Sequence, residues 1–176
     1  PVFRVWMQDS MPPTTSYRER PGRWIAEDSW PSPHIREHVF ILDHGRLAPV
    51  NEKVTEKPLS IQSPLSVGLF AGKWCSYQAP PDLPHDQRQE DGGALVFQSQ
   101  VLPEDLEIFG SPIVELELAS NRPVAMVAAR LSDVGPDDKA TRVTYGLLNL
   151  THRESHENPS PLEPGIRYRA VVALNG

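Results

Sequence analysis

The chain has 176 residues, of which 39% are apolar, and a formal net charge of -6. This length and apolar content suffice for a globular domain with a buried core. The acidic balance gives no broad electrostatic reason to bind nucleic acid or an anionic membrane. A single cysteine, Cys75, excludes an intrachain disulfide, and no run of 18 apolar residues indicates a membrane span. We expect a cytoplasmic protein with neither of those partners, in which Cys75 is a small buried apolar residue.

The first half of the chain predicts short strands separated by loops. Residues Pro1–Met7 are rich in β-forming side chains and predict a strand. A short strand and a turn are predicted over Trp24–Pro31, and a second clear strand over His38–Asp43. From Arg46 to Asp91 apolar residues stand among prolines and charges, which indicates one long excursion with short strands.

The second half is more regular. Ala94–Ser99 predicts a strand, and Ile113–Ala119 alternates apolar and acidic residues with the period of two that marks a sheet with one wet face. Val124–Leu131 is apolar on both faces, which favours a more central strand. Further strands are predicted over Arg142–Leu150 and Arg167–Leu174. No segment has a helical period over more than about two turns, so the prediction is an all-β sandwich.

Both ends of the sequence look like cuts. The chain starts at Pro1 and enters a strand-like run at once, and the last predicted strand stops at Asn175-Gly176 without a closing element. Natural domains usually cover an open sheet edge. We therefore expect a piece of a longer protein, truncated at its C-terminus by about one hairpin.

Several motifs carry a resemblance to a known family. They occur in a fixed order: Asp86-Gln87-Arg88, Leu95-Val96-Phe97, Leu102-Pro103-Glu104-Asp105-Leu106-Glu107-Ile108-Phe109-Gly110, Ala128-Ala129-Arg130-Leu131-Ser132-Asp133-Val134, and Tyr145-Gly146-Leu147-Leu148-Asn149-Leu150-Thr151-His152-Arg153. In this order and spacing, the chain resembles the C-terminal domain of the X-prolyl dipeptidyl-peptidase and cocaine-esterase family of α/β-hydrolases. The opening Phe3–Met7, Arg23-Trp24 and Trp30-Pro31 are also similar to the start of that domain.

The resemblance implies a jelly-roll-like, galactose-binding-domain-like β-sandwich. Residues 1–176 would form one accessory domain, and an upstream α/β-hydrolase domain, absent here, would be its partner and carry the catalytic serine. The chain has no Gly-x-Ser-x-Gly elbow, so no catalytic residue is assigned and the fragment is not expected to be an enzyme. The resemblance implies that the parent cleaves acyl, ester or X-Pro bonds, and that this domain braces the catalytic domain and shapes access to it. A severed interface would also allow homo-oligomers in isolation.

An alternative reading is a carbohydrate- or ligand-binding β-sandwich. Aromatic faces stack on sugar rings, and the chain has four tryptophans for such a platform, Trp6, Trp24, Trp30 and Trp74. Trp24 and Trp30 precede a proline-rich loop, and for these two we favour an interdomain contact.

Other polar sets favour structural readings. His34, His38 and His44 lack a Cys or acidic residue that would complete a zinc site, and Asp133, Asp137 and Asp138 lack the spacing of a calcium loop. Ser155-His156-Glu157, and Ser76 with Asp82, His85 and Asp86, supply the residue types of a catalytic triad without its spatial arrangement. No metal and no cofactor is predicted.

The densest cluster of polar residues in the sequence begins with Asp86 and Arg88. Arg88 offers a planar, bidentate donor suited to tying two loops together through carboxylates. We predict a structural latch between Arg88 and a nearby Asp or Glu rather than a catalytic pair.

Overall fold

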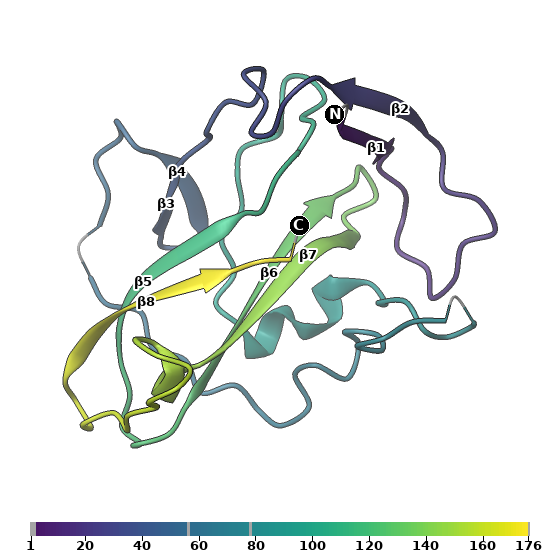
Figure 1. The fold of residues 1–176 in the computed structure, drawn as a ribbon. Coiled ribbons are helices and arrows are strands. Elements are labelled where there is room, and N and C mark those ends of the chain that lie inside the picture. Colours follow the sequence, from purple (N-terminus) through teal and green to yellow (C-terminus); the bar gives the residue numbers. More distant parts are fainter. Residues whose placement is uncertain (1–2, 56, 78, 176) are drawn as a thin grey trace. The chain divides into compact units, whose positions relative to one another are not determined.

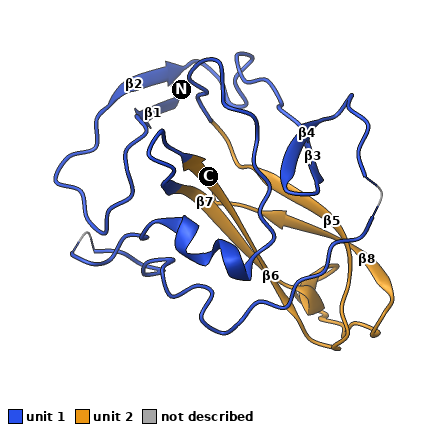
Figure 2. Ribbon diagram, turned by 180° about the vertical axis from the view of Figure 1, so that it is seen from behind, with its two compact units in different colours: residues 1–108, 134–141 blue, residues 109–133, 142–176 orange. Residues whose placement is uncertain are grey.

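A computed structural model describes residues 3–55, 57–77 and 79–175. Its regular elements are eight strands and two short 3-10 helices within these ranges (Figure 1). This composition confirms the all-β prediction. The chain divides into two compact units, coloured separately in Figure 2: residues 1–108 with 134–141, and residues 109–133 with 142–176.

The first unit contains two strand pairs and one helix. Strands β1 (Phe3–Gln8) and β2 (Gly22–Glu27) pair antiparallel. Strands β3 (Phe40–Asp43) and β4 (Arg46–Pro49) form a second antiparallel pair, joined by a tight turn in which Gly45 has a φ of 74°. The 3-10 helix η1 spans Gln87–Gly93. The other described residues of the predicted excursion from Arg46 to Asp91 run mainly as turns and irregular backbone.

Gly22 allows the first strand pair to close. It lies opposite Gln8, and a Cβ atom at this position would come within 2.1 Å of the Met7 carbonyl oxygen and 2.9 Å of Trp6 Nε1. Any side chain at residue 22 would therefore push β1 and β2 apart at this end.

The second unit has a regular ladder. Strand β5 (Ile113–Ala119) pairs antiparallel with β8 (Arg167–Ala173), from Ile113 opposite Ala173 to Ala119 opposite Arg167. Alternate residues of β5 are partly buried, as predicted, while the intervening glutamates are exposed. The 3-10 helix η2 (Leu150–His152) contributes Leu150 to the core. This core consists of Leu150, Leu162 and Ala170, with Leu118, Ala125, Val127, Leu148 and Tyr168 packed against it.

Strands β6 (Met126–Val134) and β7 (Ala140–Asn149) form a hairpin. Most of both strands belongs to the second unit, while the tip, 134–141, groups with the first. Within the described residues β6 pairs with β7 alone, so the prediction of a central strand was wrong. Its apolar outer face remains open, with Met126 66% exposed.

Two further expectations differ from the structure. Ala94–Ser99 is not a strand: its ladder contact is a single bridge between Gln98 and Arg46, because the chain here leaves η1 and runs as irregular backbone. Cys75 is exposed rather than buried. The pairings among the described residues form four two-stranded sheets, so the jelly-roll connectivity stays a prediction. Neither described helix has the length or apolar composition needed to cross a membrane.

Candidate functional site

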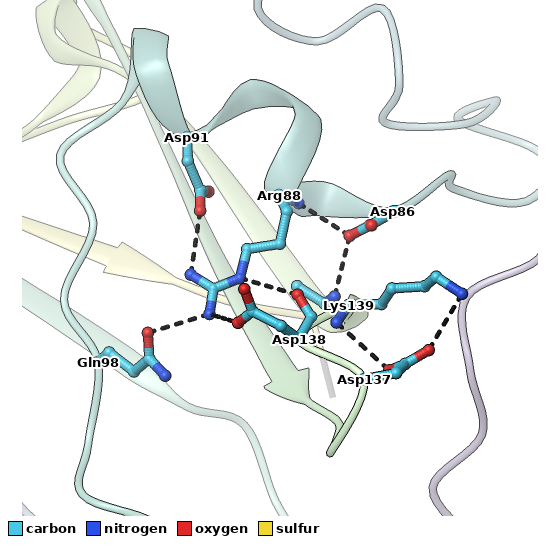
Figure 3. Close-up of polar contacts among 8 residues, drawn as sticks. Asp86, Arg88, Asp91, Gln98, Asp137, Asp138 and Lys139 are labelled. Carbon is cyan, nitrogen blue, oxygen red and sulfur yellow. Dashed lines mark hydrogen bonds and ion pairs between the residues drawn. The ribbon is translucent and has the colours of Figure 1, made fainter.

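Asp86 joins the start of η1 to the tip of the β6–β7 hairpin (Figure 3). Its Oδ1 accepts hydrogen bonds from the backbone N–H of Arg88 at 3.0 Å and of Ala140 at 2.9 Å. The first is a helix cap, which satisfies a donor that has no partner inside the helix. The second reaches 54 residues along the chain, so one carboxylate fixes two distant segments of the first unit.

Arg88 adds a second connection to the same hairpin tip. Its Nη2 lies 2.5 Å from Asp138 Oδ1, its Nε donates to the Asp138 carbonyl oxygen at 3.2 Å, and its Nη1 lies 3.2 Å from Asp91 Oδ2. Nη2 also donates to Gln98 Oε1 at 3.2 Å. Hydrogen bonds to Asp91 and then Asp138 raise the pKa of Arg88 above its ordinary value. The guanidinium of Arg88 thus positions the hairpin tip relative to helix η1.

Asp138 occupies a backbone conformation that most residues avoid. Its φ is 61°, in the left-handed region that Asp and Asn tolerate better than other non-glycine residues. Asp137, beside it, is ion-paired with Lys139 at 3.0 Å, and hydrogen bonding to Lys139 lowers the pKa of Asp137. The contacts of Asp86 and Arg88 therefore hold a turn of defined shape, and their role as a latch stays a prediction.

The predicted tryptophan surface begins on the β1–β2 hairpin. Trp6 and Trp24 face each other in register, with ring centroids 5.5 Å apart and planes at 71°. Trp24 is 70% exposed and lines an open hollow with Arg4, Ile25 and Ala26. The two rings meet edge to face and do not form one flat double platform, and the carbohydrate-binding alternative stays a prediction.

Trp30 has a different neighbour. It stacks on Phe3, with centroids 5.1 Å apart and an interplanar angle of 27°, and remains 52% exposed. Phe3 and Trp6 point to opposite faces of β1 because strand side chains alternate. Trp24 and Trp30 are therefore placed by separate ring pairs, and their interdomain role stays a prediction.

Sequence reasoning missed a set of buried polar side chains that hold the long excursion. Glu90 is buried, and its Oε1 accepts hydrogen bonds from Gly68 N at 2.6 Å and Phe70 N at 3.0 Å. Buried Gln87 donates through Nε2 to the carbonyl oxygens of Phe70 and His85, at 3.0 and 2.8 Å. Helix η1 thereby holds the backbone around residues 68–70 by side-chain hydrogen bonds.

Asp82 fixes the backbone of the next loop through its buried carboxylate. It is 2% exposed, its Oδ2 accepts from Tyr77 N at 2.9 Å, and its Oδ1 lies 2.6 Å from Lys73 Nζ. Hydrogen bonding to Lys73, then to the Tyr77 backbone, lowers the pKa of Asp82. The only sequence signal for this arrangement is a carboxylate among turn-forming prolines, and such a signal does not name the partners.

The polar sets considered from the sequence have structural contacts. His34 Nδ1 lies 2.9 Å from Glu27, and His44 Nε2 lies 3.2 Å from the Lys57 carbonyl oxygen. In the described part of the chain, no group of three His, Cys, Asp or Glu side chains is placed to hold a metal ion. Ser155 Oγ accepts from the backbone N–H groups of residues 157 and 158, as in a turn.

Comparison with known proteins identifies the family of this chain. The model of one family, the X-Pro dipeptidyl-peptidase C-terminal non-catalytic domain, matches residues 4–176. A Mycobacterium bovis protein and a Mycobacterium tuberculosis protein, both named as serine esterases, are each 24% identical over 93% of this chain. The cocaine esterase of a Rhodococcus species is 29% identical over 86% of it. The chain spans 27–28% of the length of these relatives.

Proposed function

Because the chain belongs to the family of X-Pro dipeptidyl-peptidase C-terminal non-catalytic domains, we propose that it is the accessory β-domain of a longer serine hydrolase. The family match over residues 4–176 carries this proposal. The small share of each relative that the chain spans supports it, since the remaining length accommodates a catalytic domain. The parent would cleave ester, acyl or X-Pro peptide bonds in the cytoplasm, and its nucleophile would lie outside these residues.

The domain's role would be to brace the catalytic domain and to form part of the wall around its active site. Trp24 and Trp30 are the first candidates for this contact, because large aromatic side chains that stay exposed in one domain are typical of interfaces. Each is already oriented by a neighbouring ring, which reduces the entropy lost on docking.

The test compares three proteins: the full-length parent, the parent lacking residues 4–176, and this domain alone. Each is assayed with a p-nitrophenyl ester and an X-Pro p-nitroanilide. We expect turnover by the parent, none by the isolated domain, and a lower kcat/KM together with a lower melting temperature after the deletion.

Turnover by the isolated domain would overthrow the proposal. Unchanged activity and melting after the deletion would remove the bracing role while leaving the family membership intact. Faster cleavage of one of the two substrate classes identifies the parent's chemistry.

A further inference from the structure

The stretch 64–77, here called the display loop, exposes four large apolar side chains, while Val67 and Phe70 are partly buried. Leu65 is fully exposed, Leu69 is 73% exposed, Trp74 88% and Tyr77 85%. Other stretches also expose apolar residues, but among those between residues 95 and 108 only Val101 is more than half exposed, whereas these four are each at least 73% exposed. The only charged residue of the display loop, Lys73, is neutralised by its ion pair with Asp82.

The backbone of the display loop is nevertheless fixed. Glu90 holds the N–H groups of Gly68 and Phe70, Asp82 holds that of Tyr77, and Lys73 N donates to the Asp82 carbonyl oxygen at 2.8 Å. Three of these bonds attach the loop at its middle and at its end to buried carboxylates, and the fourth ends on a backbone carbonyl.

Gly72 tightens this attachment. Its φ is 74°, and a Cβ atom there would lie 2.7 Å from Pro84 N and 2.8 Å from the Asp82 carbonyl oxygen. The loop therefore combines a close approach of two backbone segments with a conformation that favours glycine.

Buried carboxylates thus hold the loop from inside, while four of its large apolar side chains remain exposed. A loop that only connected two elements would gain by turning Trp74 or Leu69 inward, since each buried large apolar side chain contributes roughly 1.5–3 kcal/mol. A fixed backbone that displays aromatic and aliphatic side chains, with little charge, has the composition of the centre of a protein interface. Preorganisation of this kind lowers the entropy lost on binding.

We propose that the display loop is a docking surface covered by the catalytic domain of the parent chain, with Trp74 and Tyr77 as its anchors. This rests on the proposed function. The catalytic domain is the favoured occupant because the relatives are more than three times as long as this chain, so a covalently linked partner is present at high effective concentration. The matching face would be uncharged and apolar, since the display loop offers no unpaired charge of its own.

The reactivity of Cys75 can report whether the display loop is covered. It is exposed, lies between the two anchors, and is the only cysteine among these 176 residues. The rate of its alkylation by a maleimide is measured in the full-length parent by peptide mass spectrometry, which separates Cys75 from cysteines elsewhere in the parent. The same thiol is then measured in a parent carrying Leu65→Asp and Leu69→Asp, two exposed positions ten and six residues before Cys75.

We expect alkylation of Cys75 in the parent to be slow, and to accelerate about tenfold or more in the double variant, because two buried carboxylates would open the interface. The matched control is Val101→Asp, at a position 96% exposed outside the display loop, and we expect it to leave the rate unchanged. Equal rates in the parent and the double variant would overturn the inference.

Two other outcomes separate the inference from the proposed function. If Cys75 reacts rapidly in a parent whose domains melt in a single transition, the domains are coupled through another surface and only the inference fails. If the domains melt separately, the bracing role fails as well. Protection that increases with parent concentration would identify a second copy as the occupant and overturn the assignment to the catalytic domain.

Discussion

In the second unit the side chains that water cannot reach are aliphatic, whereas in the first unit most of them are polar or charged. Among the described residues, the buried side chains of the second unit are those of Leu150, Leu162, Ala170, Val172 and Leu174. Those of the first unit are Ser32, Asp43, Ala48, Asp82, Gln87, Glu90 and Ala140. Apolar burial is non-directional, while a carboxylate that accepts backbone N–H groups fixes a loop in one conformation. One domain therefore uses two different means of stabilisation, and each has its own weakness.

The largest effect is expected from a cavity in the aliphatic core. Leu162→Ala removes a side chain that is 2% exposed, and should lower the free energy of unfolding by about 2–4 kcal/mol through lost burial and an unfilled cavity. Urea denaturation followed by far-UV circular dichroism measures it. Val101→Ala, at a position 96% exposed, is the control and should change stability by less than about 0.5 kcal/mol. Equal losses from the two changes would refute the assigned core.

The next effect concerns the Arg88 cluster. Arg88→Ala removes the contacts with Asp91, Asp138 and Gln98 and should cost about 1–2 kcal/mol, since charge-assisted hydrogen bonds of a partly buried arginine exceed ordinary surface ion pairs. Thermal unfolding measures the loss.

Two companion variants show whether the guanidinium fork is the cause. Arg88→Lys keeps the charge without the fork and should recover only part of the stability. Asp138→Asn keeps a residue that tolerates the left-handed backbone but removes the ion pair, and should cost less than Arg88→Ala. Unchanged melting of Arg88→Ala would refute the latch.

Acid should weaken the first unit before the second. The pKa of Asp82 is lowered by hydrogen bonds from Lys73 and from the Tyr77 backbone. The pKa of Asp43 is lowered first by a hydrogen bond from the backbone N–H of His44. Hydrogen bonds from the backbone N–H of Thr55 and from the Arg46 side chain lower it further. A carboxyl with a lowered pKa in the folded state stabilises it fully above the unfolded value of about 4, and the contribution is lost as the pH falls through the folded value.

Tryptophan emission can report this loss selectively. All four tryptophans lie in the first unit, at positions 6, 24, 30 and 74. We expect their emission to change as the pH falls below about 4, while the circular dichroism of the β5–β8 ladder persists to lower pH. Asp82→Asn should flatten the pH dependence of the first unit. Coincident transitions by both probes would show that the two units are not separable in acid.

The smallest effect is expected on the outer face of the β5–β8 ladder. Glu115–Arg169 and Glu117–Arg167 form diagonal cross-strand ion pairs at 2.6 and 3.0 Å, and all four side chains are more than half exposed. Removing either pair by alanine substitution should change stability by less than about 0.5 kcal/mol, because water and salt screen exposed charges. The difference should shrink further in 1 M salt. A larger loss would mean that this face is less solvated than its exposure indicates.

The same contrast explains which parts of the structure could be predicted from the sequence. The strands over Ile113–Ala119 and Arg167–Ala173 were found because a half-buried strand imposes a period of two on its side chains. The contacts of Glu90 and Asp82 impose no period. Glu90 reaches backbone N–H groups 20 and 22 residues away, and a single sequence contains no record of which ones.

The candidate site was predicted in the same uneven manner. Arg88 was singled out because a guanidinium among several carboxylates has few alternatives to pairing, although its partner Asp138, 50 residues away, was not specified. Ala94–Ser99 failed for the opposite reason. It has strand-like composition, but helix η1 ends directly before it, and among the described residues its one ladder contact is the bridge from Gln98 to Arg46.

The hairpin tip that groups with the first unit has a consequence for how the chain can be divided. The backbone passes from one unit to the other after residues 108, 133 and 141, which makes three crossings. A single protease cut at any of these points leaves the two units joined by the remaining two connections. No pair of contiguous fragments corresponds to the two units, so neither can be produced as one uninterrupted polypeptide. The stability of each unit therefore has to be measured in the intact chain, with a spectroscopic probe located in that unit alone.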